Sequence, residues 1–352
     1  MKALIDKLFM KNTLEPEEYS VLISGANAEL SEYLFEKARL VSQKIFGKKI
    51  YMRGLIEITN YCKNDCYYCG IRRSNTNCER YRLTAGQILD CCETGYGLGF
   101  RTFVMQGGED SRYTDGELCD IVGEIRCRYP DCAITLSLGE RSYESYERFF
   151  QSGADRYLLR HETINPAHYS QLHPAELTIE NRRQCLYNLK KIGYQVGTGF
   201  MVGSPYQTVE NIVEDLMFLK KFSPHMVGIG PFIPHKDTVF AVQQPGSLEL
   251  TLFLTGLIRL MLPEVLLPAT TAVGTLDPRG REKSVLAGAN VIMPNLSPSS
   301  VRSKYLLYDN KAFTGAEAAE STAVLEEMMA AIGYKTVVER GDSPNMKRSG
   351  LC

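Results

Sequence analysis

The chain has 352 residues, of which 44% are hydrophobic and 23% are charged, and its formal net charge is −1. This is the composition of an ordinary folded globular protein, and the balanced charge offers no basic surface for nucleic acid or an anionic membrane. No apolar run reaches the roughly 18 residues of a membrane helix, and residues 1–20 lack the apolar core of a secretory signal, so we expect neither a nucleic-acid nor a membrane partner.

Short β-type runs recur along the chain after residues 1–48, which read as one or two helices. The first run belongs to a longer β-type stretch, Tyr51–Asn60. The runs are Leu55–Thr59, Thr102–Met105, Ile134–Leu138, Arg156–Arg160, Val196–Val202, Met226–Ile229, Leu267–Ala272 and Asn290–Met293.

The segments between these runs carry helix signals. Thr84–Gln87 and Thr114–Glu117 have the spacing of capping boxes at helix starts. Apolar residues recur at helical spacing within 179–192, before a glycine, and within 212–222, before a proline. Strands that alternate with such helices predict an α/β fold, a (βα)8 TIM barrel with flanking N- and C-terminal helices. An open doubly wound sheet is the alternative.

Three regions are expected along the chain. Residues 1–48 form an N-terminal helical extension, residues 49–310 form the barrel, and residues 311–352 form a C-terminal helix and tail. Within the last region, 315–334 is rich in Ala, Glu and Met and predicts a helix, whereas Gly341–Cys352 is polar and predicts a disordered tail.

Three cysteines follow the first β-type run with the spacing C-x3-C-x2-C. They are Cys62, Cys66 and Cys69. Three thiolates on one loop can bind three irons of a cubane iron–sulfur cluster, and four cysteines are the usual complement of an electron-transfer cluster. The motif has no fourth cysteine, so one iron is expected to stay open to a ligand. Zinc is the alternative, but it would need a fourth Cys or His at typical spacing, and the next histidine is His161.

The other cysteines fall mostly on predicted helices or near turns. The total of eleven is odd, and in a chain of this length that argues against a disulfide framework. Buried free thiols are common, so these cysteines are assigned no chemistry. We expect the protein in the reducing cytoplasm, and an open-iron cluster favours an anaerobic setting.

Polar residues and glycines gather where the β-type runs end. They include Gln106–Asp110, Ser137, Arg160–Thr163, Gly203, Thr270, Thr271 and Asn295. In a parallel barrel the carboxyl ends of the strands form the active site. Turns are polar in any case, but the charged residues Glu57 and Arg160 lie within or at the end of apolar runs.

The cysteine spacing resembles the signature of the radical S-adenosylmethionine (SAM) enzymes. This resemblance implies a 4Fe–4S cluster with SAM chelated to its fourth iron. It implies that a Gly-Gly-Glu element binds the methionyl amino group, that an arginine clamps the carboxylate, and that a glutamate accepts from the ribose. It also implies that Gly199–Gly203, which is similar to the Gly-x-Ile-x-Gly element, holds the adenine. The implied SAM set is Gly107, Gly108, Glu109, Ser137, Glu162, Arg182, Met201 and Ile229.

Some residues of this set also have a structural explanation that involves no cofactor. Glu162 and Arg182 are also readable as a surface ion pair, which stabilises a protein by under about 1 kcal/mol. Met201 and Ile229 are equally readable as residues of the barrel core.

Longer segments are similar to the HydE family, the radical SAM maturases of the FeFe-hydrogenase active site. They are Arg53, Arg80–Thr84, Arg156–Thr163, Met226–His235, Pro268–Thr271 and Gly288–Asn295. Methylornithine synthase and biotin synthase are related families, the former nearer. The resemblance implies a full barrel with the cluster and SAM at the top and the substrate deeper. Some members hold a second cluster on three cysteines near the C-terminus, but Tyr308–Met328 contains none.

The resemblance also implies a substrate and partners. The implied substrate residues are Arg53, Thr135, Arg160, Met226, Thr270, Thr271 and Tyr305. The two arginines suit an anionic substrate, namely an iron–cyanide–carbonyl–cysteine complex from a partner maturase. The product would pass towards the scaffold GTPase HydF, and a ferredoxin or flavodoxin would supply electrons. The alternatives are a HydE-like paralogue that acts on an amino acid or thioether, and a non-catalytic iron–sulfur carrier or scaffold.

Overall fold

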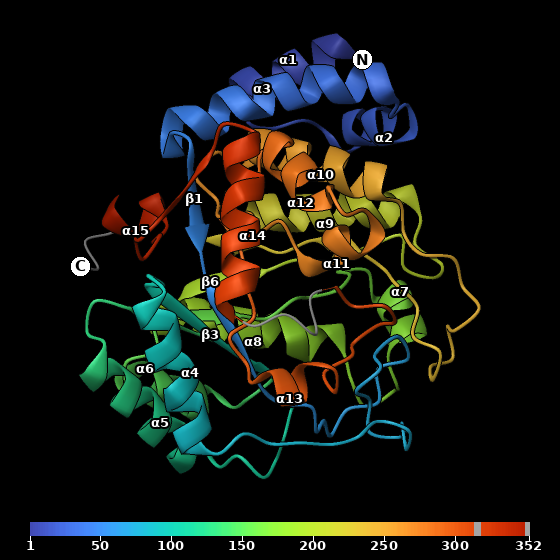
Figure 1. Cartoon of the computed structure of the whole chain (residues 1–352). Coiled ribbons are helices and arrows are strands. Elements are labelled where there is room, and N and C mark those ends of the chain that lie inside the picture. The colour runs from blue at the N-terminus through green and yellow to red at the C-terminus, as the bar shows by residue number, and fades with distance from the viewer. Residues whose placement is uncertain (313–317, 349–352) are drawn as a thin grey trace.

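Six parallel strands form the central sheet of the computed structural model, which describes residues 1–312 and 318–348 (Figure 1). In spatial order they are β2 (Gly54–Thr59), β3 (Thr102–Gly107), β4 (Ala133–Ser137), β5 (Arg156–Leu158), β6 (Gln195–Thr198) and β8 (Met226–Val227). The strands are buried almost throughout, as expected of a parallel sheet covered on both faces.

The sheet closes into a ring. Isolated bridges join Met226 to Leu266 and Pro268 to Val291. β10 (Val291–Ile292) then pairs with β1 (Lys49–Met52), which leads directly into β2. Together these pairings complete a (βα)8 barrel, so the predicted fold class is confirmed and the open sheet is excluded.

Two predicted β-type runs are divided by bends. Tyr51–Asn60 forms both β1 and β2, with the break at Arg53. Val196–Val202 is divided into β6 and β7 (Met201–Val202), and β7 pairs with β9 (Gly230–Pro231). The division falls at Gly199, whose φ is 156° and where a Cβ would lie 2.0 Å from the Gly228 oxygen. Only glycine allows the two strands to approach so closely here.

The strand predicted over Leu267–Ala272 is confirmed only for its first residues. The Ala269 N–H donates to the Val291 carbonyl at 2.8 Å, the Val291 N–H donates to the Leu267 carbonyl at 3.1 Å, and Pro268 bridges to Val291. Helix α11 (Thr271–Leu276) begins inside the run. Thr270 and Thr271 therefore stand at a helix start.

Helices surround the barrel. Those between the strands are α4 (Ala85–Gly97), α5 (Asp115–Arg128), α6 (Tyr143–Gln151), α7 (Pro166–Leu172), α8 (Ile179–Ile192), α9 (Val209–Phe222), α10 (Leu248–Met261), α11, α12 (Gly280–Leu286) and α13 (Ser299–Arg302). Both predicted capping boxes are present, at the starts of α4 and α5. Helix α8 ends at Gly193 with a φ of 111°, and α9 ends before Pro224 as expected.

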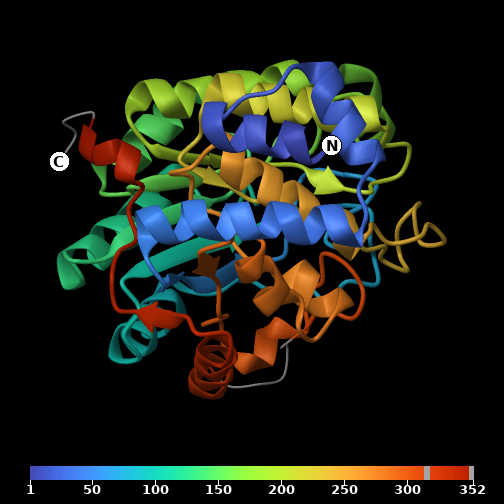
Figure 2. The same ribbon diagram turned by 90° about the horizontal axis from the view of Figure 1, so that it is seen from above.

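The N-terminal region contains three helices, so the expectation of one or two is wrong. They are α1 (Lys2–Lys11), α2 (Pro16–Ser24) and α3 (Ala28–Phe46). Pro16 at the first position of α2 and the cap at Asn27 before α3 separate them. Figure 2 shows α3 crossing the molecule, and it packs along α10. None of the described helices is both long and apolar enough to cross a membrane.

The C-terminal region comprises α14 (Ala318–Ala331), β11 (Lys335–Val337) and α15 (Pro344–Arg348). The helix predicted over 315–334 is confirmed for the described residues, and 313–317 lie outside them. β11 pairs with β1 on the side opposite β10 (Figure 1). The prediction of disorder is wrong for residues 341–348, and residues 349–352 lie outside the described part of the chain.

The tail is ordered because it bonds to the amino ends of the barrel strands. Thr102, which begins β3, donates to the Arg340 carbonyl at 2.8 Å. Asp342 accepts from Gln195 at 2.8 Å and pairs with Arg156 at 2.7 Å. Gln195 and Arg156 begin β6 and β5, so this segment seals the barrel end opposite the strand carboxyl ends.

Candidate active site

The cysteine loop leaves the carboxyl end of β2 and is held against the end of β3. The Lys63 N–H donates to the Glu109 carbonyl at 2.9 Å, and the Glu109 N–H donates to Cys62 Sγ at 3.4 Å. A Cβ on Gly108 would lie 2.2 Å from the Tyr61 oxygen. The paired glycines after β3 therefore allow the cysteine loop to lie directly on the strand end.

The three thiols of this loop are free and partly buried. Burial raises the pKa of Cys62 and Cys66 and raises the pKa of Cys69 to about 12, and at Cys66 and Cys69 the neighbouring thiols add to the rise. A bound cationic metal is what would hold such thiols as thiolates.

The ligand set fits a cluster better than a single ion. Within the described residues, no three His, Cys, Asp or Glu side chains are grouped as one metal ion would need. A cubane cluster instead takes its cysteines on separate iron atoms.

Glu109 is fixed at the mouth of the barrel. Its Oε1 accepts from the Glu140 N–H at 2.9 Å, and its Oε2 lies 3.3 Å from the ammonium of Lys63. Gly139 makes room for this side chain, since a Cβ there would lie 2.0 Å from Glu109 Cγ. The buried carboxylate thus already forms an ion pair with an ammonium group.

Arg182 comes from α8 and is buried, with an exposed fraction of 8%. Its Nε lies 2.6 Å from Glu140 Oε1, an ion pair without hydrogen-bond geometry. Burial acts against the charge, but Tyr169 and Glu140 outweigh it and raise the pKa of Arg182 well above its usual value. Arg182 therefore stays charged in a buried position.

Glu162 does not pair with Arg182. Its Oε2 lies 3.2 Å from Arg160 Nη2 and has no hydrogen-bond partner in the described structure. The side chain of Glu162 is 13% exposed. The alternative of a surface ion pair between Glu162 and Arg182 is wrong, because both are largely buried and each faces a different partner.

The remaining residues of the implied SAM set lie on other strands or just after them. Ser137 ends β4 in register with Gln106 of β3. Met201 packs with Phe232 and Phe240, and Tyr67 and Tyr68 of the cysteine loop cover this cluster. Ile229 is buried in the main core, as expected if it is a residue of the barrel core.

The implied substrate residues contain several buried polar atoms without hydrogen-bond partners. In the described residues these atoms are Arg53 Nε and Nη2, Arg160 Nε and Nη2, Thr135 Oγ1 and Thr270 Oγ1. Arg53 Nη1 lies 2.9 Å from the sulfur of Met226, and burial lowers the pKa of Arg53 well below its usual value. Because buried polar groups are normally bonded, these atoms have hydrogen-bonding capacity that a polar ligand would satisfy.

These substrate residues occupy two separate settings rather than one. Arg53 contacts Met226, whereas Arg160 contacts Glu162 near the strand carboxyl ends. Tyr305 is buried, and its hydroxyl accepts from Gln106 at 3.3 Å.

Two residues were given no role by the sequence reasoning. Glu140 stands among the polar residues at the predicted strand ends, and the structure pairs it with Arg182. Lys311 forms an ion pair with Glu57, and Asn295 donates to Glu57 at 2.9 Å. The charge of Glu57 inside an apolar run was the signal for a buried partner.

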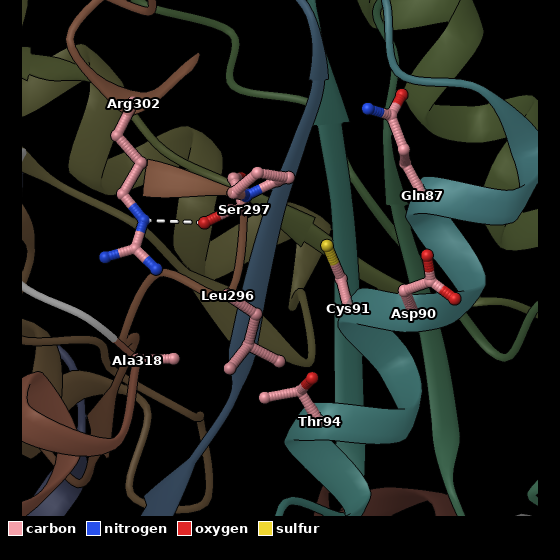
Figure 3. Close-up of a pocket in the computed structure, with 9 residues that line it drawn as sticks. Gln87, Asp90, Cys91, Thr94, Leu296, Ser297, Arg302 and Ala318 are labelled. Carbon is pink, nitrogen blue, oxygen red and sulfur yellow. Dashed lines mark hydrogen bonds between the residues drawn. The ribbon is translucent and has the colours of Figure 1, made fainter. Parts of the chain in front are cut away.

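A separate hollow of about 200 Å³ lies between α4, α13 and the residues after β10 (Figure 3). Arg302 Nε donates to the Ser297 carbonyl at 2.6 Å on one wall, and Cys91 and Asp90 stand on the other. None of the predicted site residues lines it, so it lies apart from the candidate active site.

The chain is similar to several known proteins. The family model described as the radical SAM superfamily matches residues 56–219. The FeFe-hydrogenase maturase subunit HydE of Thermotoga maritima is 47% identical over 281 residues, covering 80% of each chain. The 3-methylornithine synthase of Methanosarcina barkeri is 29% identical over 312 residues, covering 87% of each chain. A crystal structure of methylornithine synthase (PylB) superposes with a TM-score of 0.83 at 25% identity, covering 95% of this chain and 97% of that one.

The superfamily uses a 4Fe–4S cluster and SAM, and the three-cysteine loop, the buried Glu109 and the buried Arg182 fit both. The identity and coverage of the Thermotoga relative extend the match along most of the chain. The protein therefore belongs to the HydE family of radical SAM enzymes.

Proposed function

We propose that this protein is a maturase that acts in assembly of the FeFe-hydrogenase active site. The observation that carries the proposal is the 47% identity with the Thermotoga HydE subunit. When bound, the cluster and SAM supply a 5′-deoxyadenosyl radical by one-electron reductive cleavage. The protein itself binds, orients and shields the reactants.

The residue roles follow the contacts described above. Cys62, Cys66 and Cys69 hold the cluster, and the absence of a fourth cysteine from their motif leaves one iron for SAM. Glu109 takes the methionyl ammonium, which the Lys63 contact at 3.3 Å supports. Arg182 clamps the carboxylate, which its charged, buried state supports.

The remaining SAM contacts concern the nucleoside. Glu162 accepts from the ribose hydroxyls, which its unpartnered Oε2 supports. Ser137 adds a polar contact beside Gln106, and Met201 and Ile229 pack against the adenine. Gly107 and Gly108 let the cysteine loop and the SAM site share one strand end.

The substrate is anionic in this proposal. Arg160 contacts it near the strand carboxyl ends, and Arg53 contacts it from the second setting, beside Met226. Thr135, Thr270, Thr271 and Tyr305 complete the wall. A buried arginine destabilises a protein by several kcal/mol unless it is paired, so the unpartnered nitrogens of Arg53 support a bound anion. An iron–cyanide–carbonyl–cysteine complex has the required charge.

The cellular context is also part of the proposal. A partner maturase makes the substrate, the scaffold GTPase HydF receives the product, and a ferredoxin or flavodoxin supplies electrons in the reducing cytoplasm.

A second candidate function is a mutase like methylornithine synthase. The TM-score of 0.83 with that enzyme and the 29% identity with the Methanosarcina sequence favour it over other relatives. It would act on an amino acid rather than on an iron complex.

Anaerobic reconstitution with iron and sulfide, followed by SAM and dithionite, tests these proposals. The iron–cyanide–carbonyl–cysteine complex should drive formation of 5′-deoxyadenosine, and lysine or methylornithine should remain unchanged. If lysine is consumed and the iron complex is inert, the protein is a mutase rather than a maturase. A carrier or scaffold would cleave no SAM under any condition.

A crystal grown without substrate gives an independent check. It should show an anion or ordered waters on the free nitrogens of Arg53. A dry, empty interior at this position would count against an anionic substrate.

A further inference from the structure

The turn that carries Glu162 has a strained backbone. Its φ is 63°, in the left-handed region that residues other than glycine rarely adopt. Such a conformation is unfavourable and persists only where the surrounding structure enforces it. The Glu162 N–H donates to the Gly199 carbonyl at 3.1 Å, and the Glu162 carbonyl accepts from Met201 at 3.2 Å.

Asp215 of α9 contacts this turn on both sides of Glu162. The Ile164 N–H donates to Asp215 Oδ1 at 2.6 Å. His161 Nε2 lies 3.3 Å from the same oxygen. One carboxylate oxygen thus meets the residue before Glu162 and the residue two positions after it.

His161 is itself held from its other side. Its Nδ1 lies 2.8 Å from the hydroxyl of Thr198 at the end of β6. Its ring stands edge-on to Phe218, with the ring centroids 5.0 Å apart. His161, Asp215 and Thr198 are all fully buried.

This arrangement is poorly explained by stability alone. A buried carboxylate is unfavourable unless its oxygens are bonded, and Asp215 Oδ2 has no hydrogen-bond partner in the described structure. Burial raises the pKa of Asp215, although the neighbouring His161 acts against the rise. An apolar residue would pack α9 onto the barrel without these disadvantages.

We propose that Asp215, with His161 and Thr198 behind it, is a positioning residue that holds Glu162 in the orientation needed to accept from the ribose of SAM. The proposal rests on the role given to Glu162 under the proposed function. It assigns the buried face of α9 a part in cofactor binding that acts through Glu162.

The test compares Asp215→Leu and Asp215→Asn with Glu214→Gln, all on α9. Glu214 is the adjacent exposed residue and contacts only Asn165 at the surface among its hydrogen bonds. In reconstituted enzyme, Asp215→Leu should weaken SAM affinity about tenfold and reduce the SAM-induced change in the EPR spectrum, with iron content unchanged. Asp215→Asn keeps an acceptor for the Ile164 N–H and should lose less SAM affinity than Asp215→Leu. Glu214→Gln should bind SAM as tightly as the wild type.

A double-mutant cycle with Glu162→Ala separates positioning from general stability. If Asp215 acts through Glu162, then Asp215→Leu should cause no further loss of SAM affinity once Glu162 is alanine. Additive losses, or an unchanged affinity in Asp215→Leu, would overturn the proposal. An unchanged affinity in Glu162→Ala alone would instead remove the role given to Glu162.

Two measurements still test the proposal if Asp215→Leu folds poorly. Hydrogen exchange of residues 160–164 in cluster-free protein should be faster in Asp215→Asn than in Glu214→Gln, and equal rates would count against the proposal. Thr198→Val, which removes only the hydroxyl that His161 contacts, should weaken SAM affinity in the same direction as Asp215→Asn. An affinity equal to that of the wild type would overturn the part given to Thr198 and His161.

Discussion

The two ends of the barrel differ in how far their buried charged groups are paired. At the amino ends of the strands, the guanidinium of Arg156 donates to Thr102, to the Arg340 carbonyl and to Asp342, and only its Nε has no partner in the described residues. Near the carboxyl ends, Glu162 Oε2 and Thr270 Oγ1 have no hydrogen-bond partner in the described residues. The difference indicates that one end is built for stability and the other is left incomplete for ligands.

Strain and exposure follow the same division. Glu162, with its left-handed backbone, lies near the carboxyl ends of the strands. The cysteine loop follows one of those ends, and its three thiols are only partly buried. The amino ends are sealed by the C-terminal segment through Arg340, Asp342 and Ser343. Substitutions at the two ends should therefore separate stability from cofactor binding.

Removal of a cluster ligand should have the largest effect. Cys62→Ala, Cys66→Ala and Cys69→Ala should each abolish SAM cleavage by dithionite-reduced enzyme, because each removes one iron ligand. The buried Cys185 on α8 provides the control, and Cys185→Ala should keep its activity. Wild-type protein should bind about four irons and four sulfides, and SAM should change the EPR spectrum of its reduced form. Retained SAM cleavage in any of the three variants would contradict the assignment of these cysteines as cluster ligands.

Loss of a partner at the sealed end should act on stability alone. Asp342→Ala leaves the fully buried Arg156 without its ion pair and should lower the free energy of unfolding by about 3 kcal/mol. Urea denaturation measures this loss, and SAM affinity should be unchanged. The exposed pair of Glu339 and Lys49 offers a control, since Glu339→Gln should cost under about 1 kcal/mol.

The same ion pair predicts a pH dependence. Burial alone would raise the pKa of Asp342, but Arg156 and other partners hold it well below its ordinary value. A depressed folded pKa gives stability that is fully present above the unfolded pKa of about 3.9 and is lost as the pH falls through the folded value. The stability gap between wild type and Asp342→Asn should therefore be constant from pH 7 to 5 and shrink below pH 4. A gap that stays constant to pH 2.5 would show that Asp342 does not titrate in this way.

At the open end, loss of a charged group should act on SAM binding. Arg182→Ala should weaken SAM affinity by about 1.5–3 kcal/mol, the contribution of a charge-assisted hydrogen bond, while iron content stays intact. The neighbouring Arg183 is exposed on the same helix, and Arg183→Ala is the matched control. Equal affinities in the two variants would mean that Arg182 does not bind SAM.

The smallest expected effect is a gain in stability inside the barrel. Arg53→Met replaces a buried cation, two of whose nitrogens have no partner, by an apolar side chain, and should raise the free energy of unfolding by about 1 kcal/mol. Activity on the iron complex should fall at the same time. A loss of stability would show that Arg53 belongs with the paired arginines of the sealed end.

Local sequence patterns predicted much of the fold and of the cofactor site. The cysteine spacing, the capping boxes at Thr84 and Thr114, and the alternation of strands and helices depend on residues close together in the chain. Such patterns carry the barrel class, and the motif similarity adds the family. They also predicted Glu109 near the cysteines, because the carboxyl ends of parallel strands converge. Arg182 lies on helix α8, and its role came only from the family resemblance.

Pairing between distant residues was decided only by the tertiary structure. The partner of Arg182 is Glu140, the partner of Glu57 is Lys311, and Asp215 reaches the Glu162 turn from another helix. The polar tail is ordered for the same reason, since its partners lie at the starts of distant strands. Residue type and spacing along the chain determine which local structures are favoured, but only the closed barrel brings a buried charge to its partner or leaves it free for a ligand.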